Sequence, residues 1–120
     1  ILDMANKRDF RKYVGNVVNN ICQDMMIAYY NIENIDVNAI DEAIIDVLKA
    51  GEFALAQSNV KFDRSIKSFN SPIEYSKEKA KFYRTVYNKI HKEFVEAIAN
   101  ALKKFNTAIP QEVKDRNKQL

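Results

Sequence analysis

The chain has 120 residues, of which 47% are hydrophobic and 29% are charged, and a formal net charge of +3 at pH 7. This length and composition fit one domain that buries a core without metal or disulfide support. Two glycines, two prolines, one histidine and one cysteine leave few of the groups from which active sites are usually built. The sequence therefore predicts no catalytic residue, no cofactor and no metal site.

A first helix is predicted from near Asn6 to near Tyr30, with Asp9 in the first turn, where the helix dipole favours an acid. Apolar residues recur along one face at helical spacing: Phe10, Val14, Val17, Val18, Ile21, Met25 and Tyr29. Cys22 cannot form an intramolecular disulfide because it is the only cysteine. We expect it to be a buried thiol in a reducing, cytoplasmic compartment.

Residues 31–36 are predicted to be a short connection to an antiparallel second helix, which Asp36 or Asn38 can cap. The inward face of this helix is expected to carry Ile40, Ile44, Val47, Leu48, Gly51 and Leu55. Gly51 falls on the apolar stripe, where the missing side chain allows another helix or ring to come close.

Residues 58–70 form a long connection without glycine that carries Val60, Phe62, Ile66 and Phe69. Loops of this length are usually packed or functional. We expect Phe62, Ile66 and Phe69 to fold back over the third helix. The alternative is a segment that presents its aromatic rings to a partner.

The third helix has the clearest start signal: Ser71 as N-cap, Pro72 at the first helical position, and Glu74 to complete a capping box. It is predicted to continue to Phe105, a length of about 51 Å, so its N-terminal third should overshoot the two shorter helices. Its apolar stripe consists of Tyr83, Val86, Tyr87, Ile90, Phe94, Ile98, Ala101, Leu102 and Phe105.

These elements predict an all-α fold. We expect an up-down-up three-helix bundle with a long third helix, a partly structured connection over 58–70 and a polar C-terminal tail. Residues 1–120 form a single domain in this prediction, with 1–5 and 107–120 peripheral or mobile. The central core is expected where Ile44, Leu48, Ile90, Phe94 and Ile98 meet. No apolar run reaches the roughly 18 residues of a transmembrane helix, so no membrane partner is predicted.

Charge is distributed unevenly along the chain. Residues 31–56 hold six acidic side chains and one basic one, whereas residues 57–92 hold nine basic and three acidic ones. We expect the acidic second helix to lie beside the basic segment, so that charges of opposite sign meet at its rim.

The candidate partner surface is aromatic and lies around the start of the third helix: Phe62, Phe69, Tyr75, Phe82 and Tyr83. A non-catalytic protein-interaction or assembly module is the predicted function. The partner is another protein or a second copy, since a two-fold dimer is the commonest soluble oligomer.

Binding of single-stranded nucleic acid is the alternative, because basic side chains neutralise phosphates and aromatic rings stack on bases. The candidate anion patch consists of Lys61, Arg64, Lys67, Lys77, Lys81 and Arg84. A small enzyme is the least favoured class. Tyr83, Tyr87 and His91 follow one another at four-residue steps and could form a proton-transfer row, but a lone histidine is more often structural.

Overall fold

The computed structural model describes residues 6–118, and this part of the chain is all-helical, as the sequence predicts. Residues 1–5, expected to be peripheral, lie outside the described residues. Four α-helices and one 3-10 turn follow one another along the chain: α1 (Lys7–Asn31), α2 (Val37–Gln57), η1 (Ile66–Ser68), α3 (Pro72–Ala108) and α4 (Gln111–Lys118).

The three long helices begin where capping side chains are available. Asn6 accepts hydrogen bonds from the backbone N–H groups of Arg8 and Asp9. Asp36, not Asn38, caps α2 by accepting from Ala39 N–H at 3.1 Å. Ser71 accepts from Glu74 N–H at 3.1 Å, with Pro72 as the first residue of α3. Each cap satisfies backbone donors that have no partner within the helix.

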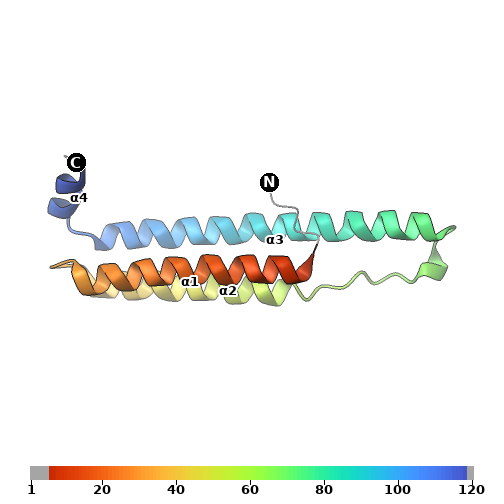
Figure 1. Cartoon of the computed structure of the whole chain (residues 1–120), viewed down its shortest axis with the longest axis horizontal. Coiled ribbons are helices and arrows are strands. Elements are labelled where there is room, and N and C mark those ends of the chain that lie inside the picture. The colour runs from red at the N-terminus through yellow and green to blue at the C-terminus, as the bar shows by residue number, and fades with distance from the viewer. Residues whose placement is uncertain (1–5, 119–120) are drawn as a thin grey trace.

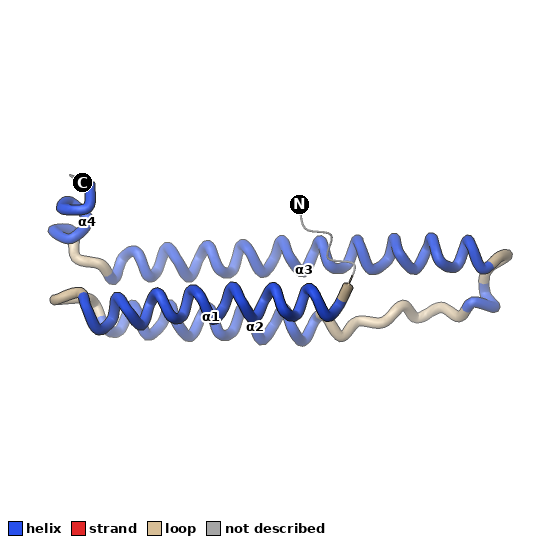
Figure 2. Tube along the Cα trace, viewed as in Figure 1, coloured by secondary structure: helices blue, strands red, loops and turns tan. Residues whose placement is uncertain are grey.

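The molecule is a rod of 65 × 26 × 17 Å with a radius of gyration of 19.5 Å, against about 14 Å for a compact domain of this size. The chain runs along α1, returns along α2 and runs again along the whole of α3 (Figures 1 and 2). The helix α2 packs along both α1 and α3. The α1, α2 and 85–108 part of the rod is called the body below.

The core of the body is the apolar face of each helix, and Ile90, Phe94 and Ile98 are buried in it as predicted. The expectation is wrong for Leu48 and Leu102, which are 51% and 42% exposed. Where three helices pack together, each helix has at most two neighbours, and these cover only part of its surface. The apolar face of the sequence is wider than the part that they cover. Residues beyond the covered part remain on the surface.

The C-terminal part of α3 extends beyond the predicted end at Phe105. Ala108 is buried, and its carbonyl oxygen accepts a hydrogen bond from Asp36 N–H at 2.9 Å. The expected tail is wrong for residues 107–108, which belong to α3. A short helix, α4, follows directly after Pro110, a residue that suits the start of a helix. Helix α4 stands at the end of the rod (Figure 1), and most of its described side chains are exposed there.

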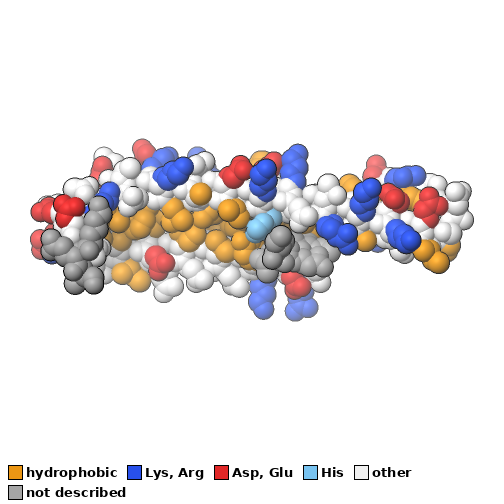
Figure 3. Space-filling model, turned by 90° about the horizontal axis from the view of Figure 1, so that it is seen from above, with side chains coloured by type: hydrophobic (Ala, Val, Ile, Leu, Met, Phe, Trp, Pro, Cys, Tyr) orange, Lys and Arg blue, Asp and Glu red, His pale blue; other side chains and the backbone are white. Residues whose placement is uncertain are grey.

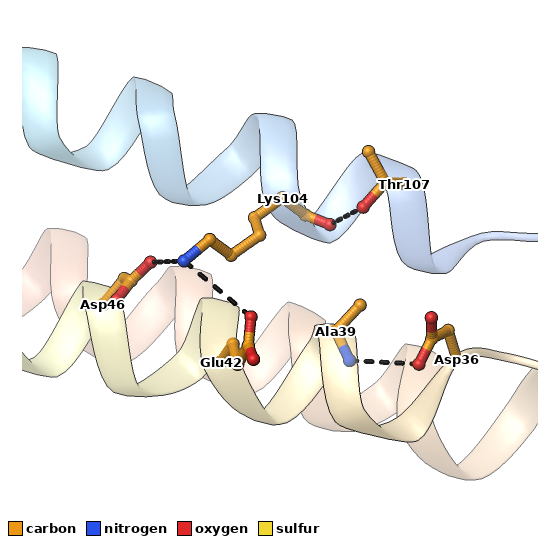
Figure 4. Close-up of polar contacts among 6 residues, drawn as sticks. All are labelled: Asp36, Ala39, Glu42, Asp46, Lys104 and Thr107. Atoms are coloured by element: carbon orange, nitrogen blue, oxygen red, sulfur yellow. Dashed lines mark hydrogen bonds and ion pairs between the residues drawn. The ribbon is translucent and has the colours of Figure 1, made fainter.

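The acidic helix α2 does not pair with the basic segment as expected. Its Asp46 and Glu42 carboxylates instead meet Lys104, at 2.6 and 4.0 Å from Nζ (Figure 4). In the described chain no ion pair joins α2 to the bases between 61 and 84. Those bases lie beyond the C-terminal end of α2, because α2 stops opposite Tyr87.

Candidate functional site

The first candidate surface is the end of the rod that neither α1 nor α2 reaches. Helix α3 has 37 residues and α2 has 21, so α3 is longer by about 24 Å. The connection that follows α2 runs extended beside the first turns of α3 and turns back through η1 (Figures 1 and 2). Residues 59–84 are called the arm.

The arm brings together all five aromatic residues of the candidate partner surface. Phe62 is central: its ring centroid lies 5.3 Å from Phe82, 5.8 Å from Tyr75 and 6.1 Å from Phe69. Phe62 N–H donates to the Tyr83 hydroxyl at 3.1 Å. All five rings are half-buried. The connection thus uses much of their area within the arm, through edge and offset contacts that aromatic rings prefer.

The six bases of the candidate anion patch are all exposed, and they come from both the connection and the first turns of α3: Lys61, Arg64, Lys67, Lys77, Lys81 and Arg84. The Arg64 guanidinium lies 4.2 Å from the Phe69 ring centroid, a cation–π contact. Ile66, expected to fold back over α3, is instead 51% exposed at the turn of the arm. It lies in η1, where the chain reverses direction before α3 begins.

The row of Tyr83, Tyr87 and His91 does not act as a unit. The rings of Tyr83 and Tyr87 stack at 5.9 Å, whereas His91 Nε2 lies 3.2 Å from the hydroxyl of Tyr13 on α1. His91 is half-buried at the edge of the apolar face, as its position in the sequence indicates. No group of three potential metal ligands occurs among residues 6–118.

The thiol of Cys22 is half-buried on α1, and burial raises its pKa above the ordinary value. The thiolate, which is the reactive form, is therefore disfavoured at neutral pH. This agrees with the structural role that its place in the apolar pattern predicts.

A second candidate surface, which was not predicted from the sequence, runs along the body between α1 and α3. Here Tyr13 contacts both His91 and Phe94 across the two parallel helices. Figure 3 shows hydrophobic side chains in a continuous stripe along this face. Steps of four and three residues from these contacts define the seam: Tyr13, Val17, Asn20, Asp24 and Ile27 on α1, with His91, Val95, Ile98, Leu102 and Phe105 on α3.

The seam is apolar, partly exposed and nearly free of charge. Ile27, Val95 and Leu102 are exposed, and Asp24 is its one acidic residue. On the outward side of α3 the residues next to the seam are exposed, and Lys92 is the one base among them. The others are Asn88, Ala99 and Asn106. Depletion of charge at the centre of an apolar patch is the compositional signature of protein interfaces. A signal for the seam is present in the sequence as the 91, 95, 98, 102, 105 spacing.

Comparisons with protein-family models, curated proteins and solved structures found no match to this chain. Among the described helices, none is both long and apolar enough to cross a membrane. What the chain binds is therefore inferred from the arm and the seam alone.

Proposed function

We propose that this chain is a non-catalytic protein-interaction or assembly module, and that the seam is its binding surface. In this proposal α1, α2 and the body part of α3 act as one three-helix bundle, and the long third helix carries the arm. The cytoplasmic location predicted from the single cysteine remains part of the proposal.

The exposed apolar seam is the observation that carries the proposal. The body already has a closed core, in which Phe10, Val14 and Met25 are fully buried. The additional apolar area at Val95 and Leu102 contributes little to that core, since both side chains are more than two-fifths exposed. A contiguous exposed apolar strip on a small protein usually marks an interaction site. Two parallel helices offer a further helix the groove that a four-helix bundle fills.

A photo-crosslinking amino acid at Leu102 tests this function in cells that make the protein. We expect a covalent adduct of defined mass at Leu102 and little at Leu48, which is comparably exposed but lies on α2. For a partner other than this chain, excess parent chain without the crosslinker should compete the adduct away; for a second copy, the parent chain itself should appear in the adduct. A Leu102→Glu chain should do neither. Equal adducts at both positions, or none at either, would refute the seam as a binding surface.

Single-stranded nucleic acid is the second candidate partner, favoured by the exposed bases of the arm. It is placed second because the aromatic rings that would stack on bases are half-buried against one another. Fluorescence anisotropy with a labelled single strand decides between a protein and nucleic acid as the main partner. Binding below about 1 μM at physiological salt, with a steep loss as salt rises, would put nucleic acid first.

A further inference from the structure

The rod is electrically polarised along its length. The arm, residues 59–84, carries seven basic and three acidic side chains. At the opposite end of the body, residues 24–46 carry six acidic and no basic side chains, and the adjoining residues 97–108 carry two basic ones. Residues 24–46 and 97–108 together are called the acidic end. The arm therefore has a charge of +4 and the acidic end a charge of −4.

The surface of the seam continues onto the arm, but its character changes there. Beyond the start of α1 at Lys7, no described element covers the side of α3 that faces α1 in the body. A shallow hollow of about 430 Å³ lies on the arm between Pro72 and Ala80, and Ile73, which lines it, is 70% exposed. Lys77, Lys81 and Arg84 follow at four- and three-residue steps and form one basic ridge. Figure 3 shows basic side chains on this end of the rod, with acidic side chains among them.

We propose that a second copy of this chain occupies the seam, antiparallel to the first and related to it by a two-fold axis that crosses α3 near Ile90. This rests on the proposed function and names the partner of the seam. Ile90 is the midpoint of α3, so the two copies of α3 overlap along their whole length, and each arm covers the acidic end of the other copy. The C-terminal half of the second copy's α1 then lies beside the arm, in the space that this chain leaves open.

Charge complementarity selects the antiparallel direction. In this arrangement Asp24 and Ile27 of the second copy reach the arm near Lys77 and Ile73, so an acid meets a base and two exposed isoleucines meet each other. A parallel pair would instead place arm on arm and acidic end on acidic end, and like charges held together oppose association.

The size of the surface approaches that of a stable dimer. A strip about 10 Å wide, the diameter of one helix, along the 37 residues of α3, or about 55 Å, covers roughly 550 Å² on each copy. Specific complexes of standard size bury about 800 Å² per partner. The overlap of the two copies of α3 over their full length is what brings the strip toward that size.

Disulfide crosslinking in a Cys22→Ser background tests the direction and the centre of the pair, at three exposed positions of α3. Asn88→Cys lies close to the axis and should crosslink to itself. Lys81→Cys and Ala99→Cys lie on opposite sides of residue 90 at equal distances, so they should crosslink to each other when the two chains are mixed. Each alone should not, because its two copies would be about 27 Å apart along the axis. Self-crosslinking at positions 81 and 99 would show a parallel pair and overturn the proposal.

Light scattering at tens of micromolar, with matched variants, tests the surface. The parent chain should show twice the monomer mass. Leu102→Glu should raise the dissociation constant at least tenfold, whereas Leu48→Glu, on the other face, should leave it within twofold. Asp24→Lys should also weaken the dimer, and adding Lys77→Glu in the same chain should restore it.

A monomer with the crosslinks absent overturns the self-association. If the photo-crosslinker at Leu102 then captures a different protein, the proposed function stands and only its partner is wrong. If it captures nothing, both fail. The proposal would also be overturned if the chain is a monomer and binds single-stranded nucleic acid through the basic ridge.

Discussion

Gly51 of α2 lies directly against Val18 of α1: a Cβ atom on Gly51 would be 2.7 Å from Val18 Cγ2. The missing side chain therefore lets α1 and α2 pack closely at the centre of the body, as the place of Gly51 on the apolar stripe indicates. Valine is branched at Cβ and has little freedom to rotate away. Gly15, on α1, is the matched case, since an added Cβ there meets no atom within 4 Å.

The two glycines should respond to alanine in opposite directions. Gly51→Ala gains about 1 kcal/mol of helix propensity but overpacks the α1–α2 contact by about 1 to 3 kcal/mol, so we expect a net loss of about 1 kcal/mol. Gly15→Ala should stabilise the chain by about 0.5 to 1 kcal/mol. Urea unfolding followed by circular dichroism measures both. Val18→Ala should relieve the Gly51→Ala variant, and stabilisation by Gly51→Ala alone would contradict the close approach.

Phe94 is expected to be a major contributor to the stability of the body. It is 3% exposed and packs edge-on against Tyr13 at 6.1 Å. Phe94→Ala should lower the free energy of unfolding by about 3 to 5 kcal/mol, enough to unfold a domain of ordinary stability. Phe53→Ala is the control, because Phe53 is 59% exposed on α2; its effect should stay within about 0.5 kcal/mol. A Phe94→Ala chain that melts within a few degrees of the parent would show that the core lies elsewhere.

The arm should be able to open without unfolding the body. Phe62→Ala removes the ring that contacts Phe69, Tyr75 and Phe82, and each aromatic pair is worth about 0.5 to 1.5 kcal/mol. Trypsin should then cut after Lys61 or Arg64 about tenfold faster or more, because local opening exposes the extended connection. Ile66→Ala should leave the rate unchanged. A simultaneous loss of the helical signal in Phe62→Ala would show that arm and body unfold together.

Tyr87 should make the chain less stable at high pH. Burial first, and the nearby Tyr83 second, raise the pKa of the Tyr87 hydroxyl above its ordinary value of 10.0. The unfolded chain therefore releases this proton at lower pH than the folded chain, and stability falls as pH rises through about 10. Urea midpoints measured between about pH 8 and 11 should decline less steeply for Tyr87→Phe than for the parent. Tyr30→Phe, at a well-exposed position on α1, should keep the parent's slope.

Local sequence signals predicted the helices well. The start of α3 followed from Ser71 and Pro72, since a capping hydroxyl and a residue without N–H suit the first turn of a helix and little else. The end of α3 was placed too early because Thr107 and Ala108 carry no strong signal of their own. Ala108 is helical since it packs in the core and accepts from Asp36, a partner far away in the chain.

The surfaces depended on relations between helices that periodicity does not contain. Leu48 and Leu102 lie on apolar stripes, yet only the placement of neighbours decides whether such a residue is covered. The acids of α2 and the bases of the arm have opposite signs, but α2 ends before the arm begins, and that offset depends on helix register. The seam was missed because most of its apolar residues were assigned to the core.

The bond between Asp36 N–H and the Ala108 oxygen also fixes how α2 and α3 can move. It joins the first turn of α2 to the last turn of α3, and Lys104 with Asp46 forms a second tie at 2.6 Å nearby. A slide of one helix past the other by a turn, about 5.4 Å, would break both and leave a backbone donor without its partner. We therefore expect that a force applied along α3 at the arm moves α2 and α3 together and does not slide one past the other.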